Sequence, residues 1–217
     1  LERRQLDLID VVGNTVLINR LLPGEGIGES DTWQLEDDVI AAFLGLDSVA
    51  VCEVESVVDK MGANFVQIRL AGVVHGTVDG AATEIELRSV YLFSHAQKRI
   101  TKMNLALKEK RSLGDATPGL DVVAKIRIGI TPSDGTTELS DQVVARALAG
   151  DEPIGQMLRY FGQRQGLQLL HDRNWFVTGE ERESVTLRRV VAGDLVAHCT
   201  IKRLPPKSAD RQATIEQ

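Results

Sequence analysis

One compact group of residues in this sequence has the chemistry for a site, the stretch "LLHDRNWFV" near the C-terminal end. His171 could serve as an acid or a base, and Asp172, Arg173 and Trp175 could orient or bind a polar partner. A nucleophilic triad would also need a serine or cysteine with oxyanion donors, and no GxSxG motif is present. The alternative, which we favour, is a turn in which Asp172 or Asn174 bonds the local backbone and Trp175 anchors a core. We predict no catalytic residue, and assign any function of the group to partner binding by His171, Arg173 and Trp175.

Metal and redox chemistry find little support in the sequence. His198 and Cys199 are neighbours on a predicted strand, so their side chains point to opposite faces and cannot share one metal ion. Cys52 and Cys199 fit no CxxC or disulfide framework, and we predict buried free thiols. We therefore expect no metal and no cofactor. The four histidines are scattered, at His75, His95, His171 and His198.

Composition excludes some classes of partner. The chain has 217 residues, 43% of them hydrophobic, which fits one large or two small domains. A net charge of −6 and a pI near 5.3 argue against nucleic-acid binding. The longest apolar run, Val39–Leu46, is too short to span a bilayer. The chain starts without Met and without a signal-peptide pattern, so we expect it to be part of a longer protein.

From residue 49 onward, apolar and polar residues alternate, which is the period of a β-strand. Asp79–Gly80 separates two such runs, and Asp-Gly in this position is the strongest short signal for a hairpin. The sequence therefore predicts an antiparallel meander with strands Val49–Lys60, Asn64–Val78, Ala81–Phe93, Arg99–Arg111 and Leu120–Thr131.

The alternation assigns one apolar and one charged face to this meander. A two-residue turn at Asp79–Gly80 places His75 opposite Glu84 on the charged face, and the next hairpin places Glu84 near Lys110. His75 and Glu84 could transfer a proton, but we favour a solvated cross-strand pair. The charged stretch Lys108–Ser112 is read in the same way, as a solvated face of the sheet rather than a partner patch.

Two elements are predicted before the meander. "NTVLINR" predicts a short strand at Asn14–Arg20, and Glu36–Leu46 predicts a helix with acids in its first turn and an apolar stripe. We expect this helix to cover the apolar face, although its length of about 16 Å leaves part of the face open. The open part is either ordinary core, which we favour, or a site for an apolar or lipid-like ligand, lined by Tyr91, Phe93, Met103, Leu105 and Ile128.

The chain changes character after the meander. Pro, Gly, Ser and Thr gather at Thr131–Asp141, which is typical of a linker, and Ser140 and Gly150 are expected to bound a short helix. A last hairpin is predicted with its turn at Ala192–Asp194. We therefore divide the chain into residues 1–132, a linker with a short helix at 133–154, and a small, incomplete module at 155–217.

Two resemblances add to this interpretation. Residues 1–132, with "LLPGEGIGESDTWQLEDDVIAAFLGL" and "PGLDVVAKIRI", resemble uncharacterised β-rich proteins of bacterial cell envelopes, including planctomycete ones. Residues 155–206, with "GLQLLHDRNWFV" and "TLRRVVAGDLVAHCTIKRLPP", resemble the PsbP-like α/β-sandwich domain. The first resemblance implies an exported or periplasmic protein and supplies no catalytic residues. The second implies a binding or assembly role.

Together these expectations describe an α+β chain, in which a long antiparallel meander covered by a helix is followed by a small PsbP-like module. The leading function is a non-enzymatic binding or assembly module of a bacterial cell envelope, with another protein as partner. The alternatives are a carrier of a small apolar ligand and, third, a hydrolase that uses His171.

Overall fold

The computed structural model describes residues 2–8, 11–133, 140–149, 157–191 and 193–204. The described residues are mostly β, with 55% in strands and 11% in helices. Its largest element is a six-stranded antiparallel sheet in the order β1-β2-β3-β4-β5-β6. The strands are β1 (Thr32–Gln34), β2 (Ser48–Met61), β3 (Phe65–Val78), β4 (Ala81–Ser94), β5 (Arg99–Arg111) and β6 (Leu120–Gly129).

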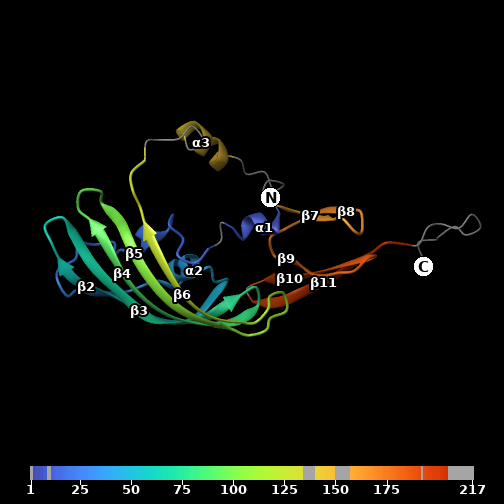
Figure 1. The fold of residues 1–217 in the computed structure, drawn as a ribbon, viewed down its shortest axis with the longest axis horizontal. Coiled ribbons are helices and arrows are strands. Elements are labelled where there is room, and N and C mark those ends of the chain that lie inside the picture. The colour runs from blue at the N-terminus through green and yellow to red at the C-terminus, as the bar shows by residue number, and fades with distance from the viewer. Residues whose placement is uncertain (1, 9–10, 134–139, 150–156, 192, 205–217) are drawn as a thin grey trace, which may run out of the picture.

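The predicted α+β class with a covering helix is therefore wrong. The helix α2 (Asp37–Leu44) exists but has eight residues, about 12 Å of helix, whereas a 14-residue strand extends over roughly 45 Å. One short helix cannot form a layer over such strands. The rest of the concave face is covered by irregular chain between α1 (Arg3–Leu6) and β2, as Figure 1 shows.

The predicted strand at Asn14–Arg20 is also wrong. This segment ends in a 3-10 helix, η1 (Ile18–Leu21), which buries two side chains in the core beside the four that α2 buries. The Leu21 carbonyl accepts hydrogen bonds from Trp33 Nε1 at 3.1 Å and from the Tyr91 hydroxyl at 3.4 Å. A strand would need a partner along its length, whereas η1 is held at one end by these two side chains.

The meander itself is confirmed, including its register. Val78 pairs with Ala81 across a two-residue turn. Its central residues, Asp79 and Gly80, have φ values of 49° and 78°, which are typical of the type I′ turn that Asp-Gly favours.

Opposite charges meet on the outer face of the sheet, as predicted. His75 lies opposite Glu84, and Glu84 lies opposite Lys110. Inward-facing and outward-facing residues continue to alternate through Lys108–Ser112, so this stretch is not solvated throughout as predicted. Lys108 and Lys110 are exposed, but Glu109 between them faces inward and is 4% exposed.

The C-terminal part forms two small antiparallel sheets. One pairs β7 (Leu158–Gly162) with β8 (Leu167–His171), and the other has the order β11-β10-β9. Residues 157–191 and 193–204 contain no helix, so the expected α/β sandwich is wrong for the part that the structure describes. The strands of the second sheet are β9 (Trp175–Glu180), β10 (Ser184–Val191) and β11 (Asp194–Lys202).

The two sheets β1–β6 and β9–β11 meet at their hairpin turns. A Cβ atom at Gly80 would lie 3.0 Å from Cγ1 of Val190, and one at Gly193 would lie 3.1 Å from Cγ2 of Thr77. A second contact is made by Arg188, whose Nη1 donates to the Asp115 carbonyl at 2.6 Å. The long sheet and the C-terminal sheet therefore touch through backbone that leaves no room for larger side chains.

The predicted helix after the linker is present as α3 (Asp141–Ala149), which stands apart from the sheets in Figure 1. Residues 134–139 of the predicted linker, its helix end at Gly150 and the chain beyond residue 204 lie outside the described residues. No helix that the structure describes is long and apolar enough to cross a bilayer.

Gly72 on β3 provides a test of the sheet packing. A Cβ atom there would lie 1.9 Å from the Glu53 carbonyl oxygen and 2.6 Å from Cα of Val54, both backbone atoms of β2. We expect Gly72→Ala to lower the free energy of unfolding by about 1–3 kcal/mol, because the strands must move apart. Urea denaturation measures the change.

Gly129→Ala is the matched control, since a Cβ at that position meets nothing within 4 Å. It is expected to leave the unfolding midpoint unchanged or slightly raised. Equal midpoints for the Gly72→Ala variant and the wild type would contradict the strand spacing described.

Candidate binding cleft

A cleft of about 870 Å³ lies between α1, the β7–β8 hairpin, β9 and the turn at Asp79. It lies where the end of the long sheet approaches the C-terminal sheets. His171 and Trp175, two of the three predicted partner-binding residues, line it from β8 and β9. The sequence reading thus singled out two residues that belong to one cavity.

Aromatic side chains are concentrated in this cleft. The whole chain has only nine aromatic residues, and four of them, Tyr160, Phe161, Trp175 and Phe176, line the cleft. Phe161 is 56% exposed. Aromatic residues and arginine are the types most enriched in interface hot spots, so the lining has the composition of a recognition surface.

Arg3 of α1 closes one wall of the cleft. Its Nη2 donates to the carbonyl oxygens of Arg173 and Trp175, the latter at 3.3 Å. Its guanidinium carbon lies 4.2 Å from the centroid of the Phe176 ring, a cation–π contact. The Nε of Arg3 is buried and has no hydrogen-bond partner among the described residues. Buried donors usually have a hydrogen-bond partner, so this atom is an exception among the described residues.

Charges of both signs line the cleft. Arg4 is paired with Glu2 at 2.8 Å, whereas Arg159 and Arg164 are exposed and make no ion pair with any residue that the structure describes. Partial burial raises the pKa of Tyr160, and the nearby Glu180 carboxylate raises it further. The cleft therefore offers two unpaired cations beside a phenol that stays neutral.

The turn expected in the "HDRN" stretch is confirmed, but Trp175, expected to anchor a core, is only partly buried and lines the cleft. The Asp172 side chain accepts a hydrogen bond from the Asn174 backbone N–H at 2.8 Å, as in an Asx-turn. The Trp175 N–H donates to the Asp172 carbonyl at 3.2 Å. His171 is 8% exposed, and its Nδ1 lies 2.8 Å from the Asp172 carbonyl oxygen. The turn delivers Trp175 to β9 and to the cleft.

Arg173 points elsewhere. It lines a neighbouring hollow of about 350 Å³ together with Arg3, Asp79 and Phe176. Arg3, Asp79 and Phe176 line both hollows, whereas Arg173 lines only the smaller one. The structure therefore separates Arg173 from the other two predicted partner-binding residues.

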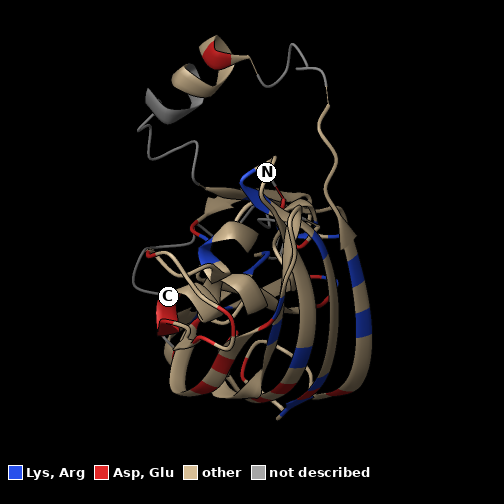
Figure 2. Cartoon of the chain, turned by 90° about the vertical axis from the view of Figure 1, so that its left-hand side faces the viewer, with Lys and Arg blue, Asp and Glu red and all other residues tan. Residues whose placement is uncertain are grey.

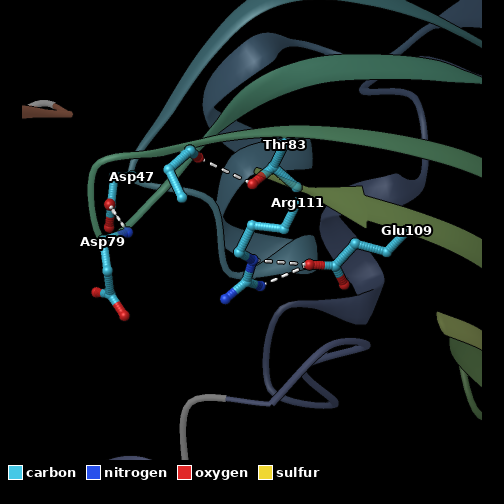
Figure 3. A network of polar contacts seen from close by, with 6 residues as sticks. Asp47, Asp79, Thr83, Glu109 and Arg111 are labelled. Atoms are coloured by element: carbon cyan, nitrogen blue, oxygen red, sulfur yellow. Dashed lines mark hydrogen bonds and ion pairs between the residues drawn. The ribbon is translucent and has the colours of Figure 1, made fainter. Parts of the chain in front are cut away.

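A network of polar contacts lies at this end of the long sheet (Figure 3). Arg111 donates from Nε at 3.1 Å and from Nη2 at 2.5 Å to the same Glu109 oxygen. The backbone N–H of Asp79 donates to Asp47 Oδ2 at 2.5 Å. Burial raises the pKa of Asp79, the Asp47 carboxylate raises it further, and Arg3 and Arg111 partly offset both effects.

The predicted apolar ligand site is mostly packed core. Tyr91 is 0% exposed, and burial raises the pKa of its hydroxyl. Met103, Leu105 and Ile128 are also buried in the same core cluster. Phe93 borders a hollow of about 270 Å³, where its ring meets His95 edge-on at 5.9 Å. Leu105, although buried, is also among the residues that border a second hollow, of about 820 Å³. A ligand at the other four positions would have to displace core side chains.

Neither metal nor nucleophile chemistry is built into the described part of the chain. It holds no group of three or more His, Cys, Asp or Glu residues placed to bind a metal. Cys52 and Cys199 are free thiols there, and no serine, threonine or cysteine lines the cleft beside His171.

Comparisons with protein-family models, with curated proteins and with solved structures found no match. The resemblances to envelope proteins and to the PsbP-like domain therefore stay expectations.

Sequence reasoning missed most of the cleft, although one signal was available. Tyr160, Phe161, Trp175 and Phe176 all lie within one short stretch of a chain that is only 4% aromatic. Such clustering in the sequence could have identified this surface. Nothing in "LERRQLD" indicates that Arg3 closes onto β9, because that contact joins residues more than 170 positions apart.

The raised pKa of Asp79 predicts a pH-dependent stability. The folded state binds this proton more tightly than the unfolded state, so stability falls as pH rises from about 3.9 through the raised pKa. Asp79→Asn removes the charge and retains a residue that tolerates the type I′ turn. We expect the variant to be more stable than the wild type at pH 7, and the pH-dependent part of this gain to vanish below about pH 4. Urea unfolding at both pH values measures it, and a gain that grows as pH falls would contradict the assignment.

Proposed function

We propose that this chain is a non-enzymatic binding module whose cleft takes an extended segment of a partner protein. The observation that carries the proposal is the gathering of four of the nine aromatic residues on one open, mixed-charge cleft. Aromatic rings bury large area at little cost in rotamer entropy. Arg159 and Arg164 add cations that can meet carboxylates of the partner.

The shape of the site favours a peptide segment over a small molecule. Ligand pockets for small molecules are enclosed and mostly apolar, whereas this cleft is open and has Glu180, Arg159 and Arg164 among its lining residues. We therefore expect the partner segment to contain acidic residues beside apolar ones.

The location in a bacterial cell envelope is part of the same proposal. Its support is the resemblance of residues 1–132 to β-rich envelope proteins. A negatively charged chain is also poorly suited to nucleic acid or to an anionic membrane surface, which leaves a protein as the natural partner. The carrier and hydrolase alternatives find no favourable observation in the cleft or the core.

A random-peptide display selection against the purified chain tests the function. We expect peptides with acidic and aromatic or aliphatic residues to be enriched, and Phe161→Ser to weaken their binding about tenfold or more, because loss of one aromatic anchor costs roughly 1.4 kcal/mol or more. Fluorescence anisotropy of a labelled peptide measures the dissociation constant.

Phe65→Ser is the matched control. Phe65 is a similarly exposed phenylalanine, at 44%, and lies on β3 outside the cleft. Its loss should leave peptide binding unchanged. Selected peptides that bind the Phe161→Ser and Arg164→Glu variants as tightly as the wild type would overturn the proposed function.

A further inference from the structure

The edge of the long sheet at β6 is open. β6 pairs with β5 alone among the strands that the structure describes. On its outer side Val123 is 71% exposed, and on its inner side Val122, Ala124 and Ile126 are only partly buried. Figure 2 shows this strand at the margin of the sheet. A long edge with apolar residues on both faces is a template for pairing with another strand.

The hydrogen bonds to β5 show which backbone groups face outward. The Ile130 N–H donates to the Thr101 carbonyl at 2.8 Å, and these residues continue the register in which Met103 lies opposite Ile128. Hydrogen-bonded and non-hydrogen-bonded pairs alternate along an antiparallel ladder. The even-numbered residues of β6 therefore bond to β5, and the odd-numbered ones from Asp121 to Gly129 direct their N–H and C=O groups to the open edge.

We propose that β6 pairs antiparallel with β6 of a second copy of this chain, around a two-fold axis at Ala124. The two long sheets then form one continuous sheet. Ala124 is the midpoint of Leu120–Ile128, so this register pairs nine residues of each strand. The pairs across the interface are Asp121 with Arg127, Val123 with Lys125, Val122 with Ile126 and Leu120 with Ile128, each formed twice, and Ala124 with itself.

Charge decides between this register and its neighbours. Lys125 and Arg127 would protect the edge against an identical strand unless an acid lay opposite them. In the proposed register Asp121 of each copy faces Arg127 of the other. A shift that puts the axis at Lys125 places two lysines face to face, and a shift that puts it at Val123 leaves Ile128 without a cross-strand partner.

The two-fold pairing is also complete on the inner face. The inward positions of β6 are all apolar from Leu120 to Ile128. Pairing each with an apolar residue of the second copy extends the core across the interface. None of these residues lines the cleft, so the inference is independent of the proposed function.

Disulfide trapping tests the register in the full chain with Cys52→Ser and Cys199→Ser in the background. Ala124 would face its own copy in a non-hydrogen-bonded pair, where Cα atoms lie about 4.5 Å apart, within disulfide reach. We expect Ala124→Cys to form a covalent dimer on mild oxidation. Val123→Cys is the control, because its two copies would lie more than about 7 Å apart. Equal or greater trapping of Val123→Cys would overturn the proposal.

A charge swap tests the pairing without cysteines. We expect the wild type to show twice the 23.8 kDa mass of one chain by light scattering. Asp121→Arg or Arg127→Asp alone should weaken the dimer about tenfold or more, because each places like charges opposite one another twice. The double variant should restore the dimer.

A wild type that stays monomeric at high concentration, or a double variant that dimerises no better than the single ones, would overturn the proposal. Both side chains are exposed, and circular dichroism of each variant verifies the fold.

Discussion

The two-residue turn at Asp79–Gly80 is the constraint on which most of this structure depends. Its left-handed backbone fixes Val78 opposite Ala81, and the pleat then decides the face of every residue in two 14-residue strands. A slip of one residue would expose the apolar set and bury the charged one. The same turn touches the C-terminal sheet at Val190 and lines the cleft through Asp79. Strand register and the position of the cleft are therefore set at one point.

Several short segments share the task of covering the apolar face of the long sheet. Strands of this length present a long apolar face, and α2 is too short to cover it. The 3-10 helix η1 adds two buried side chains to the cover. The carbonyl of its last residue, Leu21, accepts hydrogen bonds from Trp33 and Tyr91. At the end nearest the C-terminal sheets the inner face becomes polar, and the buried Glu109 forms an ion pair with Arg111. The apolar core thus ends where the cleft begins.

Local patterns were enough to predict the meander, whereas contacts between distant segments were not. The five long strands and the His75–Glu84 pairing follow from the period of two and from one Asp-Gly turn. The "HDRN" turn follows from a side chain that bonds its own backbone. The predicted α+β class was wrong because the amphipathic pattern of α2 indicates a helix but not a helix layer. With eight residues, α2 is much shorter than the 14-residue strands. The cleft could not be predicted, because Arg3 reaches β9 from the other end of the sequence.

Docking of the C-terminal sheet against the long sheet is the central claim, since the cleft exists only if the two turns touch. Nuclear Overhauser contacts in solution test it most directly. The structure predicts contacts from the Val190 methyls to the Gly80 α-protons, and from the Thr77 methyl to Gly193. Observing the Val78–Ala81 and Val191–Asp194 contacts within each hairpin while both contacts between the turns are missing would contradict the account.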